Sequence, residues 1–337
     1  MLHGASPLGT GDAGDPDALI VPARDGALRV LGAASAAGVE RVVMTSSANA
    51  ASPSSYTEDG VTDESLWTDL DDPTLPAYRR SRTVAEQAAW DSMAKSGSNG
   101  PTPTTLTTIL PGAVFGPRLT VDTLGSVQVI RRLLRGDMPG TPRIGLEVVD
   151  VRDIADVHVR AMTAPEAAGK RFLATGEFLW MADIAGVLRA ELGPDADRVP
   201  ARKIPDLVVR ATARFRPELR GIMPGLGRRN RHTTAKAQRV LGWAPRPAAD
   251  AVVDCARRPA RPVAARPRPP AGRPPGHLPP APSPSPPRRS PPSTTSSPPA
   301  TPHPPADAGP SSSGTSPRSS RSAGVRCRAG GCRRCCR

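Results

Sequence analysis

The most constraining feature of this sequence is a sharp change in composition at Arg257. From Arg257 to Arg337 the chain has 15 arginines, one acidic residue and 22 prolines, and it has no Ile, Phe, Tyr, Trp, Met, Lys, Glu, Asn or Gln. Such a segment cannot bury enough apolar surface to offset the entropy lost on folding. Residues 257–337 are therefore predicted to be a disordered tail rich in Pro and Arg, so the fold must come from residues 1–256.

The formal charge of +14 belongs to this tail alone, because residues 1–256 hold equal numbers of basic and acidic residues. The basicity of the whole chain therefore says nothing about what the folded part binds. Arginines bind polyanions by counterion release, but the tail has no aromatic residue to stack on bases, so no specific nucleic-acid partner is expected. A GC-rich gene read out of frame gives a similar composition. Two origins of the tail, a real segment and a frameshift product, stay open.

The cysteines and apolar runs indicate a reducing, aqueous compartment. No run approaches the roughly 18 apolar residues of a membrane helix, and the first residues lack a signal-peptide pattern, so no membrane partner and a cytoplasmic location are expected. Only Cys255 lies near the body, which excludes a disulfide framework. The other cysteines have poor spacing for zinc, and no metal is predicted: Cys327, Cys332, Cys335 and Cys336.

The body alternates between two hydrophobic patterns. Short β-branched runs bounded by small residues indicate buried strands, and longer runs with apolar residues three and four apart indicate helices. Strands are expected at 41–46, 105–110, 145–149 and 171–175. Helices are expected at 17–37, 77–94, 126–134, 151–162, 181–192, 205–215 and 234–241. This order predicts an α/β protein with a parallel sheet.

Candidate catalytic residues lie in two segments, Thr45-Ser46-Ser47-Ala48 after the first of these strands and Tyr78-Arg79-Arg80-Ser81-Arg82 at the start of the next helix. Ligands of open α/β sheets bind outside the carboxyl ends of the strands. Tyr78 and Arg82 share a helical face, and a nearby cation favours phenolate, which moves a tyrosine pKa from about 10 toward neutrality. A serine would hold a carbonyl while the tyrosine moves a proton and a nicotinamide moves a hydride.

In this order and spacing the motifs resemble those of the extended short-chain dehydrogenase/reductases. The likeness is to the dihydroflavonol-4-reductase-like branch of the NAD-dependent epimerase/dehydratase family, and it covers about residues 1–256. The segments that carry it are His3-Gly-Ala-Ser-Pro7, Gly38-Val-Glu-Arg-Val-Val-Met-Thr-Ser-Ser47, 78–86, Leu110-Pro-Gly-Ala-Val-Phe-Gly-Pro117, 149–156 and 234–243.

The resemblance implies roles for individual residues. Ser47 matches the serine of the family's Ser-Tyr-Lys triad, Tyr78 its acid/base and Arg82 the position of its lysine. The implied cofactor is NADP or NAD, and the implied substrate is a small-molecule carbonyl compound. Positions that contact the dinucleotide in the family correspond to Ala5, Ser6, Tyr78, Arg82, Pro111, Gly112 and Val114.

Two departures from the family limit this expectation. Arginine stands at position 82, and its planar fork cannot simply replace a compact ammonium. The family's Gly-x-x-Gly-x-x-Gly turn, which seats the pyrophosphate on a helix N-terminus, has no counterpart in the chain. The chain matches the family from about its fourth strand onward. We therefore expect a partial Rossmann fold, a doubly wound parallel sheet with its first strands missing, and doubtful dinucleotide binding.

The expected organisation follows from the same comparison. Residues 1–117 would be the distal part of the Rossmann domain, 118–256 a small mixed α/β substrate cap with returning Rossmann elements, and 257–337 the tail. The resemblance also implies a homodimer formed through two helices, one of which carries Tyr78.

Two functional hypotheses stay open. One is an NAD(P)H-dependent oxidoreductase, impaired as written, that reduces a ketone or aldehyde on a small to medium hydrophobic substrate. The other is a non-catalytic fragment or degenerate reductase domain that acts only as a binding module. Asp150 before an apolar helix is interpreted as an N-cap rather than a substrate contact, and His158 as a structural residue rather than a catalytic base.

Overall fold

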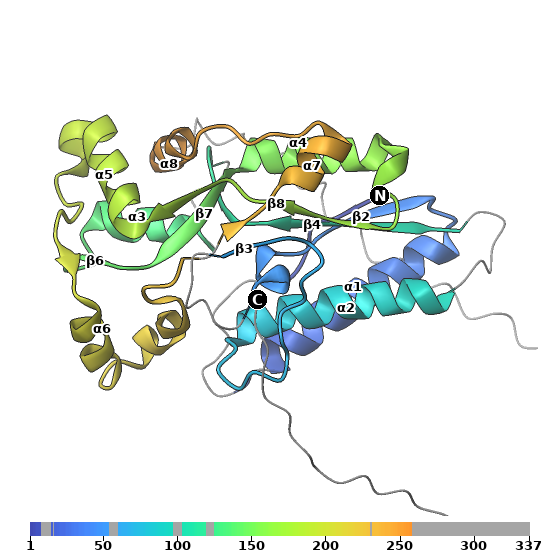
Figure 1. Cartoon of the computed structure of the whole chain (residues 1–337), viewed down its shortest axis with the longest axis horizontal. Coiled ribbons are helices and arrows are strands. Elements are labelled where there is room, and N and C mark those ends of the chain that lie inside the picture. The colour runs from blue at the N-terminus through green and yellow to red at the C-terminus, as the bar shows by residue number, and fades with distance from the viewer. Residues whose placement is uncertain are drawn as a thin grey trace, which may run out of the picture. The chain divides into compact units, whose positions relative to one another are not determined.

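Four parallel strands form the central sheet of the protein, in the order β1-β2-β4-β8 (Figure 1). The computed structural model describes residues 1–7, 15, 17–53, 60–96, 103–118, 125–229 and 231–257. The predicted tail, with its four cysteines, lies outside the described residues except for Arg257. The strands of this sheet are β1 (Leu2–His3), β2 (Arg41–Thr45), β4 (Thr105–Pro111) and β8 (Lys170–Ala174).

Helices cover both faces of this sheet, as Figure 1 shows. On one face lie α1 (Asp17–Ala36) and α2 (Ala77–Ser96), and on the other lie α4 (Val151–Thr163) and α7 (Ala235–Leu241). Because successive side chains of a strand point to opposite faces of the sheet, the side chains of β2 pack against both helix layers. Val42 and Met44 pack with α1 and α2, whereas Val43 packs in the cluster that contains Val157 and Trp243.

A second sheet of three strands extends from the carboxyl end of β4. Its order is β5-β7-β9, with β5 and β7 parallel and β7 and β9 antiparallel. The strands are β5 (Ala113–Phe115), β7 (Gly145–Asp150) and β9 (Glu177–Trp180). Helices α3 (Val127–Arg135), α5 (Met181–Leu192) and α8 (Ala248–Ala256) pack on it around a shared apolar core.

The remaining elements are short. Two pairs of parallel two-residue strands are β3 (Val61–Thr62) with β11 (Arg231–His232), and β6 (Thr141–Pro142) with β10 (Lys203–Ile204). The other helices are α6 (Asp206–Ala213) and four 3₁₀ helices, η1 (Ala48–Ala51), η2 (Pro165–Ala167), η3 (Gly193–Ala196) and η4 (Pro217–Gly225). No helix within the described ranges is long and apolar enough to cross a membrane.

The predicted α/β class and parallel sheet are confirmed, and each predicted helix and strand is present with ends within two residues. The prediction missed the two- to four-residue strands, which are too short to show a period of two. It also missed α8, whose alanine-rich sequence lies directly before the tail. The division at residues 117 and 256 stays a prediction.

A buried ion pair connects the layers on the α2 side of the sheet. Glu86 of α2 is fully buried, and its carboxylate receives a hydrogen bond from Arg171 Nε of β8 at 2.8 Å. The hydroxyls of Ser46 and Thr108 donate to the same carboxylate at 2.6 and 2.7 Å. The guanidinium of Arg171 stacks over the ring of Trp67, 3.5 Å from its centroid. One carboxylate thus joins α2 to β4, β8 and the residue that follows β2.

Removal of the Arg171 charge would leave this carboxylate buried beside neutral donors only. We expect Arg171→Met to lower the free energy of unfolding by about 3–5 kcal/mol, since an unpaired buried charge is strongly destabilising. Adding Glu86→Gln to that variant should restore part of the lost free energy of unfolding, because it removes the unpaired charge. Urea unfolding measures both changes.

The matched control is Arg24→Gln, which breaks the partly exposed Arg24–Asp25 pair and should cost no more than about 1 kcal/mol. A loss of that small size in Arg171→Met would show that the Glu86 pair does not hold the layers together.

Candidate active site

The turn after β2 carries the first predicted catalytic residue. Ser47 is the N-cap of η1 and its side chain is buried. Its oxygen accepts two hydrogen bonds from Asn49, from the backbone N–H at 3.2 Å and from the side-chain amide at 3.1 Å. No acceptor for the hydroxyl proton of Ser47 lies among the residues that the structure describes. Because a hydroxyl has one proton and two acceptor positions, Ser47 can donate to an incoming oxygen atom.

The neighbouring Ser46 has the opposite arrangement. Its hydroxyl donates to the buried Glu86 carboxylate at 2.6 Å, so its only proton is already in use. Of the two adjacent serines, Ser47 is the one whose proton is available to a substrate.

Tyr78 and Arg82 lie one turn apart in α2, as predicted from their spacing. The guanidinium carbon of Arg82 lies 4.9 Å from the centroid of the Tyr78 ring, which is within the range of a cation–π interaction. Arg82 is buried, and its Nη2 donates to the carbonyl oxygen of Pro7 at 2.8 Å. Its Nε is buried without a hydrogen-bond partner among the described residues. The second and third residues of the predicted triad are therefore in direct contact.

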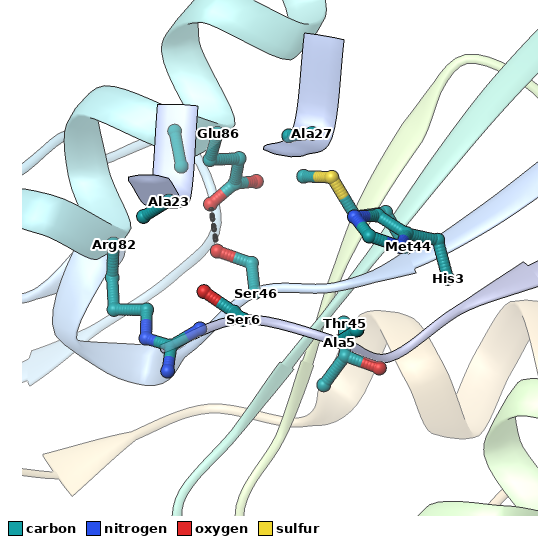
Figure 2. A pocket seen from close by; sticks show the side chains of 11 residues that line it. His3, Ala5, Ser6, Ala23, Ala27, Met44, Thr45, Ser46, Arg82 and Glu86 are labelled. Atoms are coloured by element: carbon teal, nitrogen blue, oxygen red, sulfur yellow. Dashed lines mark hydrogen bonds between the residues drawn. The ribbon is translucent and has the colours of Figure 1, made fainter. Parts of the chain in front are cut away.

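A narrow pocket opens between the carboxyl ends of β1 and β2 and the helices α1 and α2. In Figure 2 the Arg82 side chain extends beside Ser6, and the bond from Ser46 to Glu86 forms part of the wall. Alanine and serine side chains make up about half of the lining. The residues that line this pocket are His3, Ala5, Ser6, Ala23, Ala27, Met44, Thr45, Ser46, Arg82, Ala85 and Glu86. The structure thus brings Ala5, Ser6 and Arg82 together.

The other predicted site residues lie outside this pocket lining. Pro111 is the last residue of β4 and pairs with β8, and Val114 of β5 pairs with β7. Gly112, between them, donates its N–H to the carbonyl of Ala174 at 3.4 Å. Ser47 and Tyr78 are not part of the lining either. The roles of these residues therefore stay predictions.

Groups from distant parts of the chain hold the η1 turn beside Ser47. Thr68 donates through its hydroxyl to the Asn49 carbonyl at 2.6 Å and through its N–H to the Ala50 carbonyl at 3.1 Å. Arg171 also donates to the Ala50 carbonyl, at 3.3 Å. Arg79, in the first turn of α2, donates to the carbonyl of Ser52 at 3.0 Å. Sequence reasoning missed Thr68 and Arg171, because no local pattern relates residues so far apart. The only available signal was an arginine inside an apolar strand.

The interpretation of Asp150 as an N-cap is confirmed. Its carboxylate accepts the backbone N–H of Arg152 at 2.7 Å and also binds the Arg152 guanidinium. The Arg152 guanidinium lies beside Asp150 and holds the pKa of that carboxyl below its usual value, even though burial acts in the opposite direction. Asp150 is therefore an ionised structural group.

His158 of α4 is buried and has both ring nitrogens in hydrogen bonds, as expected of a structural histidine. Nδ1 lies 2.7 Å from the Ile154 carbonyl, and Nε2 lies 2.7 Å from the Thr45 hydroxyl. A carbonyl only accepts, so Nδ1 carries the proton of the neutral ring and Thr45 donates to Nε2. Burial lowers the pKa of His158 from its ordinary value of 6.5. Burial likewise lowers the pKa of His3 in the pocket lining.

About half of the chain matches the model of a known protein family. The model of the 3-beta hydroxysteroid dehydrogenase/isomerase family matches residues 11–188. This range contains β2, η1 and α2, and so it includes Ser47, Tyr78 and Arg82.

Curated relatives include two plant enzymes. Cinnamoyl-CoA reductase 1 of Arabidopsis thaliana is 36% identical over 178 residues, which are 52% of this chain and 48% of the relative. Cinnamoyl-CoA reductase 1 of Oryza sativa subsp. japonica is 35% identical over 204 residues, or 60% of this chain and 56% of the relative. The chain thus spans about half the length of these curated relatives.

Solved structures with a similar fold include reductases. The yeast methylglyoxal/isovaleraldehyde reductase Gre2 in complex with NADPH superposes with a TM-score of 0.61 at 24% identity, covering 76% of this chain and 74% of that chain. Vestitone reductase from alfalfa (Medicago sativa L.) has a TM-score of 0.55 at 20% identity, covering 75% and 73%. At these identities the likeness establishes the Rossmann-type fold.

The buried His158 predicts a pH dependence of stability. Because its folded-state pKa lies below the unfolded value of about 6.5, its contribution is complete above that pH and is lost as the pH falls toward the folded value. The slope for one proton is at most about 1.4 kcal/mol per pH unit. The stability advantage of the wild type over His158→Gln should therefore be smaller at pH 5 than at pH 7.5 in urea unfolding. An equal or larger advantage at pH 5 would contradict this assignment.

Proposed function

Because this chain belongs to the 3-beta hydroxysteroid dehydrogenase/isomerase family, we propose that it is an NAD(P)H-dependent oxidoreductase. Its reaction would be reduction of a ketone or aldehyde on a small to medium hydrophobic substrate. The relatives that carry the name cinnamoyl-CoA reductase support a carbonyl-reducing activity, and the NADPH complex of the yeast reductase supports the cofactor class. A cytoplasmic location and pairing of two copies through two helices, one of which is the Tyr78 helix α2, belong to the same proposal.

We assign the nicotinamide end of NADP or NAD to the surface beside Arg82, because the enclosed pocket itself, at about 10 Å³, has room only for a water molecule. The small side chains of Ala5 and Ser6 allow close approach to the backbone, and the buried Nε of Arg82 is a donor without a partner in the described part of the chain. When bound, the reduced nicotinamide supplies the hydride. The residues proposed to hold the dinucleotide are Ala5, Ser6, Tyr78, Arg82, Pro111, Gly112 and Val114.

Three side chains perform the proton chemistry in this proposal. Ser47 donates a hydrogen bond to the carbonyl oxygen of the substrate and so fixes its orientation. Tyr78 gives its phenolic proton to that oxygen as the carbonyl becomes an alcohol. Arg82, over the face of the tyrosine ring, stabilises the negative charge that develops on the phenol.

The observation that carries this proposal is the hydrogen bonding of Ser47. Asn49 donates two hydrogen bonds to the Ser47 oxygen, while the hydroxyl of the adjacent Ser46 donates to Glu86. The fold therefore presents one serine as a donor at the carboxyl end of the sheet, where Rossmann-type folds bind their ligands.

One observation favours the alternative, a domain that binds without catalysing. Arg82 directs Nη2 to the Pro7 carbonyl, so part of its charge serves the protein's own backbone. In the short-chain dehydrogenase/reductases that the motifs resemble, a lysine stands at this position, where it binds ribose hydroxyls and lies near the tyrosine.

The reductase proposal predicts turnover that depends on Ser47 and Tyr78. The full chain should oxidise NADPH or NADH in the presence of a panel of hydrophobic aldehydes and ketones. Ser47→Ala should lower kcat about 100-fold, as for loss of one oxyanion donor, and Tyr78→Phe by at least about 100-fold, since it removes the proton donor. Nicotinamide absorbance measures the rate.

Ser65→Ala is the matched control, because Ser65 is exposed and its hydroxyl bonds, among the described residues, only to Asp63; its rate should equal that of the wild type. A wild-type chain with no cofactor-dependent turnover across the panel would overturn the proposal in favour of the binding module.

The arginine at position 82 predicts a gain of activity in Arg82→Lys. A compact ammonium releases the Pro7 carbonyl and removes the unpaired Nε, so we expect kcat/KM to rise at least about threefold. Steady-state kinetics at equal folded concentration, checked by circular dichroism, measures the change. A folded Arg82→Lys protein with lower kcat/KM would show that the guanidinium itself is the better group in this site.

A further inference from the structure

A second buried polar cluster lies outside the pocket and joins three separate elements. Glu147 of β7 and His232 of β11 have side chains only 7% and 2% exposed. Glu147 accepts the backbone N–H of His232 at 2.7 Å, and its other carboxylate oxygen is paired with His232 Nδ1. On its far side, His232 Nε2 lies 3.0 Å from the Ser52 hydroxyl at the end of η1.

The Ser52 hydroxyl continues the series of bonds beyond His232. It donates to the carbonyl of Ala48 at 2.7 Å, while its oxygen lies against His232 Nε2. The imidazole ring therefore joins the Glu147 carboxylate on its Nδ1 side to Ser52 on its Nε2 side.

This series of bonds ends one residue from the proposed catalytic serine. Ala48 directly follows Ser47 and is the first residue of η1. At its other end the series reaches Glu147, whose backbone lies beside the turn after β4, because a Cβ added to Gly112 would be 2.4 Å from the backbone carbonyl oxygen of Glu147. The cluster therefore connects the Ser47 turn to the backbone next to Gly112, a residue proposed to contact the dinucleotide.

We propose that Glu147 and His232 are positioning residues that, through Ser52, hold the Ser47 hydroxyl at a fixed place relative to the Gly112 turn. This inference rests on the role of Ser47 in the proposed function. Errors of about 1 Å in the position of a reacting group can reduce rates about 100-fold. A buried pair with both ends bonded limits such movement of the turn.

The cluster also contains the residue types of a Ser-His-Glu nucleophilic triad, but its geometry argues against that chemistry. Ser52 is 1% exposed, and its hydroxyl donates to a backbone carbonyl. A nucleophilic serine must instead give its proton to the histidine and face a substrate. The cluster therefore positions the turn and does not attack a substrate.

The experiment compares the wild-type chain with Ser52→Ala and His232→Gln. Ser52→Ala removes only the hydroxyl between His232 and Ala48, and His232→Gln removes the ring while keeping one amide donor. We expect kcat to fall about tenfold in Ser52→Ala, with the KM for the nicotinamide cofactor unchanged. His232→Gln should fall less, because its amide can still reach Ser52. Hydrogen exchange of the amides in residues 46–53 should be faster in both variants.

Arg246→Gln is the matched control. It breaks a more exposed pair with Asp153, whose carboxylate Arg246 binds at 2.8 Å, and no contact of this pair reaches η1 in the described residues. It should lower the melting temperature without changing kcat or the exchange of residues 46–53.

Either of two results would overturn the inference: an unchanged kcat in Ser52→Ala, whatever its KM, or unchanged exchange in residues 46–53. A wild-type chain without turnover would refute the proposed function instead. The exchange comparison would then still decide whether the cluster holds the turn.

Discussion

The arrangement of the site depends on the buried ion pair between Glu86 and Arg171. A carboxylate with no exposure requires a partner charge and further donors, and it finds them on three separate elements. Arg171 reaches it from β8, Thr108 from β4 and Ser46 from the end of β2. Because Glu86 lies one helical turn after Arg82, the pair also sets how the helix that carries Tyr78 lies against the ends of the strands.

The turn that carries Ser47 shows how this constraint reaches the proposed chemistry. Arg171 donates both to Glu86 and to the Ala50 carbonyl, so one guanidinium holds the helix and the turn together. Glu147 and His232 reach the same turn through Ser52. A hydroxyl held in this way needs little rearrangement when it binds a carbonyl, which is the physical basis of preorganised catalysis.

The sequence predicted the architecture well because apolar periodicity is a local property. A buried strand is indicated by the apolar run Val42-Val43-Met44 itself, whatever lies elsewhere in the chain. In the same way, the position of Asp150 directly before an apolar helix indicates that it caps this helix. The predicted contact between Tyr78 and Arg82 is local in the same way, since four residues separate them. The role of Arg171 and the link from His232 to Ser52 could not be predicted, because their partners are 85 and 180 positions away in the chain and meet them only in the folded protein. Which of the two serine hydroxyls, Ser46 or Ser47, already donates its proton likewise depends on Glu86, which lies on another element.

The most direct test of this account is binding of the dinucleotide. Trp90 of α2 directs its ring N–H toward Glu86, and Trp67 stacks on Arg171, so both indoles lie close to the proposed site. Titration of the full chain with NADPH and with NADH, followed by tryptophan fluorescence, should show saturable quenching by at least one of them. Fluorescence that does not change with either nucleotide would contradict the account and leave a domain with the fold of a reductase but not its cofactor.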